Sequence, residues 1–505
     1  MFAGKRHRVF RHNRGTSLTS ETEKKPGISP EDRRMAFGAI AGGVVNIIKT
    51  VLQLLLLPVM ARLLGPSEFG LYALALPTIS LVTLLADGGL GNTLVREQES
   101  SSLVWSSAFW ALQIMGITLA VAAAVFGVFL GYVAQQPRLP GLIALLSLSL
   151  VFLTLSVAPL ARLTRRKNIG VGASADLVSN IVGATLAVTL AVYGAGAWSL
   201  AGQYVVTFGV RAIILNLAVM EFPRFEFSFS ALRPHLVSGG IMVASRISEY
   251  AGRAVENLML DKLFGTALLG SFTFANQVSK FASESVANMS WGALYVQALT
   301  ESKDRIVILH RQLCRLLGLA MLPATFIGAA AAPELVSLLL GPKWADLPFL
   351  LRIFLPLYAI SAICSQTAPV LLAYGRFEIQ FWCIVGLTVG RLLAVAGGIW
   401  YGFTGVAYGM IAVLLTYSVA MLTISGEATG CRPLPMLAGL VRPALSSVIA
   451  AAAYLFTSSF FPLGAAGTLL GLCAALATYA LCMVLLDWKN LREDWTSVRR
   501  ILVKH

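Results

Sequence analysis

Residues 61–75 read ARLLGPSEFGLYALA, and residues 260–275 read LDKLFGTALLGSFTFA. At an offset of 200, six positions of the first stretch correspond to positions of the second: Arg62 and Lys262, Leu63 and Leu263, Gly65 and Gly265, Phe69 and Leu269, Gly70 and Gly270, and Tyr72 and Phe272. Glycine and proline interrupt helices where a chain turns. We therefore interpret both stretches as one kind of helix-to-helix turn, used once in each half of an internally repeated chain.

The composition is that of a membrane protein. The 505 residues are 57% hydrophobic and only 12% charged, with a mean hydropathy of +0.76, whereas soluble domains are about 45–50% apolar. About 20 helical residues cross the hydrocarbon core of a bilayer. We expect an all-α polytopic membrane protein with about 14 transmembrane helices: 36–61, 70–90, 106–131, 140–161, 172–193, 197–219, 236–260, 266–294, 312–340, 349–373, 378–399, 402–425, 442–461 and 465–486.

The offset of 200 places the first span on the seventh and the second on the eighth. Six spans separate the copies, so both have the same orientation, as in transporters built from parallel repeats. We expect two six-helix lobes around a central cavity, plus two C-terminal helices. The predicted parts are a basic, disordered cytoplasmic tail (1–35), an N-lobe (36–225), a C-lobe (226–430), spans 13 and 14 (431–487) and an amphipathic cytoplasmic tail (488–505).

The Lys and Arg residues behind the formal net charge of +15 are distributed unevenly among the loops. When the loops are assigned alternately to two sides, one side receives 28 Lys and Arg residues and the other receives five. This is the positive-inside bias, and it places both termini in the cytoplasm rather than indicating a nucleic-acid partner. The six cysteines and five histidines lack metal-ligand spacing, and no Walker A pattern occurs, so we expect no cofactor, metal or ATP hydrolysis.

Ionisable residues inside the spans indicate the cavity. A charge at the bilayer centre costs about 2.5–3.5 kcal/mol, so such residues should face protein or water. The candidates on spans 1, 2, 7 and 8 are Asn46, Lys49, Gln53, Asp87, Arg246, Glu249, Arg253, Glu256, Gln277, Lys280, Glu284 and Asn288. Subtracting 200 from Arg246, Glu249 and Arg253 gives Asn46, Lys49 and Gln53, so the polar stripe repeats although its charges do not.

These residues allow two interpretations. Arg and Lys bind phosphate well in a low-dielectric site, so a cavity with Lys49, Arg246, Arg253 and Lys280 suits an anionic substrate, while Glu249, Glu256 and Glu284 could tune its charge or bind a proton or Na⁺. Alternatively, the charges of span 7 neutralise one another as structural pairs at helical spacing, and Asp87 is a helix-end carboxylate. Asp176, Arg211 and Arg391 are isolated in the sequence, and we expect them to be structural.

Three segments carry a family resemblance. The stretch ARLLGPSEFGLYALA, followed by LLADGGLGNTLVRE, resembles the opening of bacterial polysaccharide-export flippases of the Wzx type, in the multidrug/oligosaccharidyl-lipid/polysaccharide exporter superfamily. APELVSLLLGPKWADLPFLLRIF at 332–354 is similar to a later segment of that family. The resemblance implies movement of a polyprenyl-diphosphate-linked oligosaccharide across the inner membrane by alternating access, in two six-helix lobes whose cavity is lined by spans 1, 2, 7 and 8.

The resemblance also implies partners and leaves alternatives. The product would feed the polysaccharide polymerase and chain-length machinery that assemble exopolysaccharide, capsule or O-antigen, and the protein would contact membrane lipids but no nucleic acid. A drug/cation antiporter or a flippase for the peptidoglycan lipid precursor could use the same fold. A membrane glycosyltransferase or polymerase is the less favoured alternative, because the expected outer loops are short.

Overall fold

The computed structural model describes residues 30–87, 94, 102–166, 168–220, 223–228, 250–429, 433–460 and 464–503. Within these ranges every regular element is a helix, which confirms the all-α fold class. The helices are α1 (Pro30–Leu64), α2 (Pro66–Asp87), α4 (Ser102–Ala134), α5 (Leu139–Arg165), α6 (Ile169–Val192), α7 (Ala197–Val219), a helix over 250–264, α9 (Thr266–Thr300), α10 (Lys303–Ala330), α11 (Ala332–Leu339), the 3-10 turn η1 (Pro342–Trp344), α12 (Leu347–Cys364), α13 (Thr367–Ala373), α14 (Phe377–Thr429), α15 (Pro433–Phe460) and α16 (Ala465–Val503).

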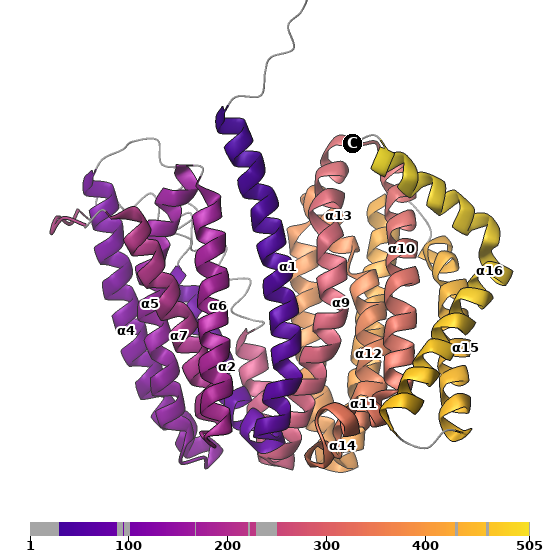
Figure 1. The fold of residues 1–505 in the computed structure, drawn as a ribbon, viewed down its shortest axis with the longest axis horizontal. Coiled ribbons are helices and arrows are strands. Elements are labelled where there is room, and N and C mark those ends of the chain that lie inside the picture. The colour runs from indigo at the N-terminus through magenta and orange to yellow at the C-terminus, as the bar shows by residue number, and fades with distance from the viewer. Residues whose placement is uncertain are drawn as a thin grey trace, which may run out of the picture.

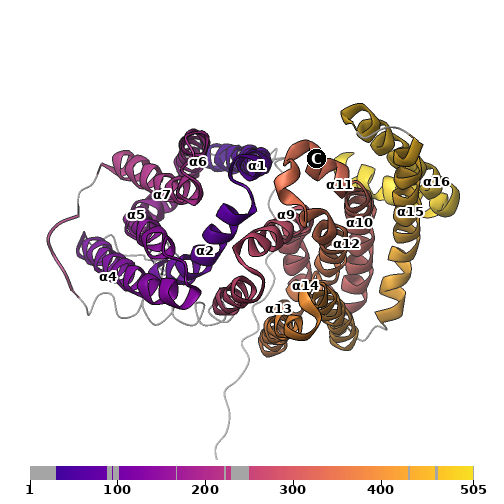
Figure 2. The same cartoon turned by 90° about the horizontal axis from the view of Figure 1, so that it is seen from below.

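The helices form two lobes that lie side by side (Figures 1 and 2). In the first lobe α4, α5 and α7 pack together, α6 joins α7 to α1, and α2 packs on α5. In the second lobe α12 contacts α9, α10 and α14. The last two helices, α15 and α16, pack on the far side of the second lobe, against α10. Between the lobes, the main contact is that of α2 with α9.

The turns at the two repeated stretches have the same geometry. Gly65 and Gly265 both have positive φ, at 82° and 85°, a conformation that glycine adopts without steric cost. Gly65 N–H donates to Ala61 O, and Gly265 N–H donates to Asp261 O. Each glycine carbonyl then accepts a hydrogen bond from the amide four residues later. The repeat with its offset of 200 is thus confirmed at the backbone of these turns.

The two repeated stretches also contact each other. A Cβ added to Gly70 would lie 1.8 Å from the carbonyl oxygen of Thr266, and a Cβ added to Gly270 would lie 1.8 Å from the carbonyl oxygen of Pro66. Each contact is the other shifted by 200, as in a self-complementary two-fold interface. Backbone therefore packs on backbone where α2 crosses α9, and only glycine fits at the crossing.

Further contacts join the lobes at the end of the molecule that carries Gly65 and Gly265, which we call the closed end. The ring of Trp344 packs against Phe69 and Phe274, and its Nε1 donates to Ala61 O at 3.0 Å. Three more hydrogen bonds cross there: Asn257 Nδ2 to Ala73 O at 2.7 Å, Gln136 Nε2 to Thr266 Oγ1 at 2.8 Å, and Arg62 to Leu338 O at 3.3 Å. The opposite end, where α1 begins and α16 ends, is called the tail end.

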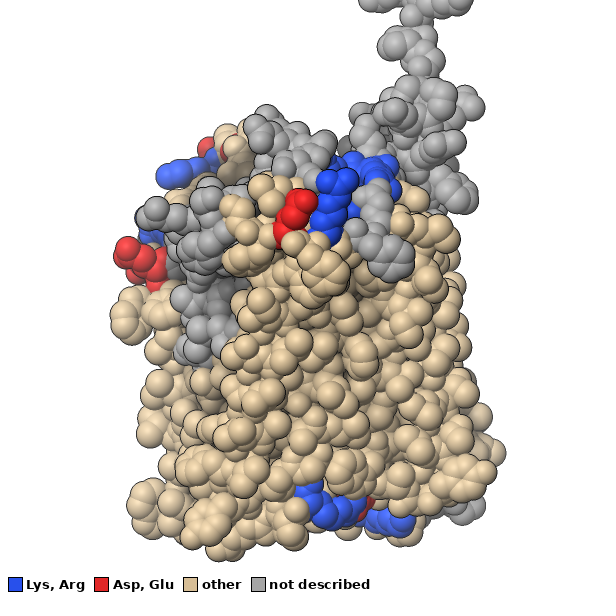
Figure 3. All heavy atoms as spheres, turned by 90° about the vertical axis from the view of Figure 1, so that its left-hand side faces the viewer, with Lys and Arg blue, Asp and Glu red and all other residues tan. Residues whose placement is uncertain are grey.

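The surface matches a membrane-embedded chain. Ten helices in the described ranges are long and apolar enough to cross a membrane, and α14 supplies one stretch of 47 residues. Gly402 bends α14 with a positive φ of 66°, so it holds two crossings. Figure 3 shows a broad band of uncharged side chains on one face, with Lys and Arg gathered at its two ends. The helices α2 and α9 are not among the ten, and both line the cavity described below.

Several predicted boundaries differ from the structure. The predicted span 312–340 is two helices, because α10 ends at Ala330 and α11 starts anew with Pro333 in its first turn. The predicted span 349–373 is also divided, between α12 and α13. The predicted break between the spans 378–399 and 402–425 is confirmed, because α14 bends at Gly402, where the backbone is not helical. The helix α1 begins at Pro30, inside the predicted 1–35 tail, and residues 1–29 lie outside the described ranges.

A buried carboxylate fixes the bend of α16. Asp487 departs from helical geometry with φ −142° and ψ 21°, and its side chain is fully buried. Arg315 of α10 and Arg442 of α15 both bind it, at 2.6 Å and 2.5 Å. After the bend, residues 488–503 run as a helix across the tail end (Figure 1).

The crossing of α2 and α9 gives a testable prediction. In a cysteine-free background with a reporter cysteine at Ala73, which is 3% exposed, we expect Gly270→Ala to raise the rate of thiol labelling in detergent by about tenfold. Overpacking of this kind costs about 1–3 kcal/mol, which favours separation of the two helices. Gly292→Ala is the matched control on the same helix, because an added Cβ there meets nothing within 4 Å. Equal labelling of the two variants would contradict the crossing.

Candidate functional site

A cavity of about 740 Å³ lies between the lobes. Its walls come from α1, α2, α6 and α7 of the first lobe and from the 250–264 helix, α9, α12 and α14 of the second. The sequence predicts walls from spans 1, 2, 7 and 8. The structure adds α6, α7, α12 and α14. On α7 the lining residues Gln203, Thr207 and Arg211 follow one another at four-residue spacing, a polar stripe that the sequence analysis missed.

The structure brings seven of the predicted site residues to this cavity: Lys49, Gln53, Arg253, Glu256, Gln277, Lys280 and Glu284. Asn46 is exposed on α1 and does not line the cavity. Asp87 is the last residue of α2, but its side chain is outside the described part of the structure. Arg246 and Glu249 also lie outside the described residues.

Three ion pairs line the cavity. Arg391 of α14 binds Glu256 at 2.9 Å, with only 14% and 4% of the two side chains exposed. Arg211 of α7 binds Asp176 of α6 at 2.7 Å. Lys280 and Glu284 pair along α9 at 3.6 Å, and the side chain of Glu284 is 51% exposed. Asp176, Arg211 and Arg391, which the sequence analysis treats as structural, are therefore both paired and part of the cavity wall.

These pairs could not be found from sequence spacing. Glu256 and Arg391 are separated by 135 residues, and the helices that carry them come together only in the folded lobe. A general signal did exist, because a lone charge inside a span requires a partner from another helix or a wet surface. That argument selects the residue but cannot identify its partner.

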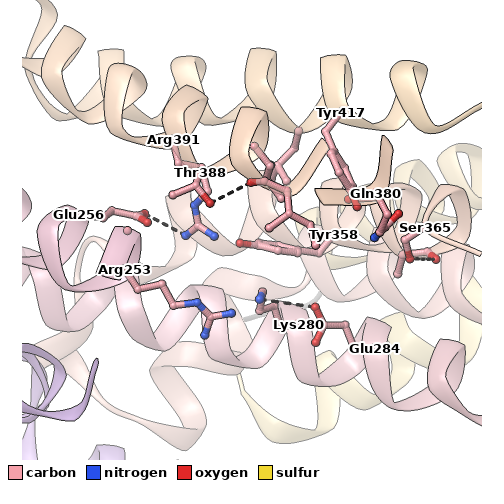
Figure 4. Close-up of a pocket in the computed structure, with 16 residues that line it drawn as sticks. Arg253, Glu256, Lys280, Glu284, Tyr358, Ser365, Gln380, Thr388, Arg391 and Tyr417 are labelled. Atoms are coloured by element: carbon pink, nitrogen blue, oxygen red, sulfur yellow. Dashed lines mark hydrogen bonds and ion pairs between the residues drawn. The ribbon is translucent and has the colours of Figure 1, made fainter. Parts of the chain in front are cut away.

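A side chamber of about 210 Å³ extends from the cavity into the second lobe (Figure 4). The charged groups of Arg253, Lys280 and Arg391 gather beside Tyr358 in this view. The Tyr358 hydroxyl donates to the side-chain oxygen of Asn276 on α9. Tyr358 is therefore held in place by α9, and three cationic groups from three helices surround it.

The cavity carries more positive than negative charge. Its lining includes five cationic side chains and three carboxylates: Lys49, Arg211, Arg253, Lys280 and Arg391, and Asp176, Glu256 and Glu284. Each of these three carboxylates pairs with a cation, and the five cations and three carboxylates give the described part of the lining a net formal charge of +2. Because charge interactions strengthen where water is scarce, this excess favours an anion in the cavity. Among the described residues, no three His, Cys, Asp or Glu side chains are grouped to hold a metal ion.

Comparison with known proteins places the chain in a family. A family described as polysaccharide biosynthesis protein matches residues 59–348, more than half of the chain. The chain is 25% identical over 436 residues to the succinoglycan biosynthesis transport protein ExoT of Rhizobium meliloti, covering 84% of this chain and 87% of that protein. It is 23% identical over 405 residues to the lipopolysaccharide biosynthesis protein WzxC of Escherichia coli, covering 77% and 82%.

The fold is shared with a solved flippase structure. The lipid II flippase MurJ, in an inward closed conformation, superposes with a TM-score of 0.69 at 12% identity, covering 90% of this chain and 100% of MurJ. At that identity the likeness concerns the fold alone. The family match and the two-lobed architecture agree, and the chain is a member of the polysaccharide biosynthesis protein family.

Proposed function

We propose that the protein moves a polyprenyl-diphosphate-linked oligosaccharide from the cytoplasmic to the periplasmic leaflet of the bacterial inner membrane. The observation that carries this proposal is a cavity between two lobes with two excess positive charges, since a diphosphate is the anionic group of such a lipid. The names of the relatives, a succinoglycan transport protein and a lipopolysaccharide biosynthesis protein, support the same cargo class. The proposed activity is transport, with no catalytic step assigned.

We further propose an orientation and a transport cycle. The excess of Lys and Arg at one set of loops assigns the tail end and both termini to the cytoplasm. The closed end then faces the periplasm, so the cavity would receive its substrate from the cytoplasmic side. Separation of α2 from α9 would open the other side, and the delivered lipid would reach the polymerase and chain-length machinery of exopolysaccharide, capsule or O-antigen assembly.

The charge of the cavity separates the proposal from one alternative, an organic-cation exporter. An organic-cation exporter would gain from acidic cavity residues without cationic partners, whereas each described cavity carboxylate pairs with Lys or Arg. A peptidoglycan precursor carries the same diphosphate, so the cavity does not distinguish that cargo by charge. Loss of polymer with normal cell-wall synthesis in a strain lacking the gene would separate the two.

One prediction of this proposal concerns the cationic side chains of the cavity. In host cells lacking the chromosomal copy, we expect Lys49→Ala or Arg253→Ala to lower polymer export by about tenfold or more, because one hydrogen bond to a charged group is worth about 1.5–3 kcal/mol. Arg376→Ala removes an exposed cation outside the cavity and should leave export unchanged. Polymer yield is compared at equal protein level, and normal yield from both cavity variants would refute the assignment.

Another prediction concerns the ion gradient that would drive transport. We propose that a proton or Na⁺ gradient drives the cycle, with Glu249, Glu256 and Glu284 as the candidate ion sites. Glu284 is the most accessible described member, and its neutralisation would release the charge of Lys280 to the substrate. In reconstituted vesicles, Glu284→Gln should make the transport rate independent of the imposed gradient. Glu301→Gln, at an exposed position outside the cavity, is the control, and a Glu284→Gln protein that still responds would remove this residue from the candidates.

A further inference from the structure

The cavity has two levels along its axis. Lys49, Arg211, Arg253 and Lys280 lie 11 to 15 residues from the closed-end termini of their helices, about 16–22 Å at 1.5 Å per residue. A second group lies only six or seven residues from those termini, about 9–10 Å, and carries no charge. This group, which we call the floor, consists of Leu57, Tyr72, Ala73, Gln203, Tyr204, Asn257, Phe272 and Thr273.

The partly exposed aromatic side chains of the floor are Tyr72 and Tyr204, and buried aromatic rings support the floor from behind. Tyr204 packs against Phe208 one turn along α7, with ring centroids 5.0 Å apart. Phe272 of α9 is 2% exposed and meets Phe354 edge to face at 5.4 Å. Rigid aromatic side chains give large contact area with little loss of conformational entropy. The floor is therefore a preformed surface rather than one that must order on binding.

Two amide side chains give the floor hydrogen-bonding capacity. Asn257 donates one N–H to Ala73 O at 2.7 Å, and its side-chain oxygen accepts no hydrogen bond from a described residue. Gln203 makes no side-chain hydrogen bond within the described part of the chain, although it lines the cavity. An occupant with hydroxyl groups can hydrogen-bond to both amides, whereas a hydrocarbon chain cannot, so the two amides favour a polar occupant.

We propose that the floor binds the sugar residues of the substrate, while the cations above it hold the diphosphate. This rests on the proposed function and deepens it. A sugar ring has apolar C–H faces that fit aromatic rings and hydroxyl groups that fit amides, which both donate and accept. The cations lie farther from the closed end than the floor does, so a diphosphate bound by the cations would place the attached sugar toward the floor. The oligosaccharide therefore enters first.

The test compares two lipids on the full-length protein in nanodiscs. One is undecaprenyl diphosphate, and the other is the lipid-linked oligosaccharide purified from host cells that lack this gene. Wild-type protein should bind the glycosylated lipid more tightly. Tyr204→Ala and Gln203→Ala should each reduce that preference by about fivefold, with unchanged affinity for undecaprenyl diphosphate, which also verifies that the variants fold. Tyr204→Phe should retain most of the preference, and Lys49→Ala should weaken binding of both lipids.

A control variant and the results that would contradict the sugar site complete the test. Tyr193→Ala removes an aromatic ring that is 83% exposed outside the cavity and should change neither affinity. Equal binding of both lipids by the wild type, or floor variants that keep the full preference or weaken both lipids alike, would overturn the sugar site while leaving the flippase proposal intact. Failure of the wild type to bind either lipid would instead reject the proposed function, and the sugar site with it.

Discussion

The architecture depends on a contact between two backbones. At the crossing of α2 and α9, Gly70 lies on the carbonyl of Thr266 and Gly270 on that of Pro66, and no side chain separates the helices. Two helices that touch this closely at one end must diverge toward the other if bulky side chains line them there. Phe272, Lys280 and Phe281 lie farther along α9 on the cavity wall. The same contact thus closes one end of the molecule and makes room for a cavity beyond it.

Ion pairing explains how a charged cavity can exist inside an apolar protein. A lone buried charge is expensive, and pairs with additional hydrogen bonds offset part of that cost. Here each described cavity carboxylate neutralises one cation, and the most enclosed of these pairs, Glu256 with Arg391, joins two helices of the same lobe. The pairs hold their helices together, and the described lining still has a net formal charge of +2. In the proposed function this net charge attracts the anionic group of the substrate.

The sequence predicted what local pattern can determine. The offset of 200 located both turns, and helical periodicity selected the cavity faces of α1 and α9, including Lys49 and Lys280. It could not pair Asp176 with Arg211 or Glu256 with Arg391, because those contacts depend on how separate helices pack. The floor was missed for a related reason. Tyr72, Gln203 and Asn257 carry no charge, so a search for ionisable residues inside the spans passes over all three until the fold brings them together.

The two copies of the repeat are alike at the closed end and differ in the cavity. At the closed end, equivalent residues of both lobes meet, so its geometry follows from symmetry. In the cavity the symmetry is lost, since the second lobe supplies Arg253, Glu256, Lys280, Glu284 and Arg391, whereas the first supplies Lys49, Asp176 and Arg211. The repeat therefore determines the shape of the closed end, and the positions where the two copies differ determine the charge of the cavity. Because the α2–α9 contact and the cavity lining lie on different residues of the same helices, substitutions in the cavity need not alter the contact that closes the molecule.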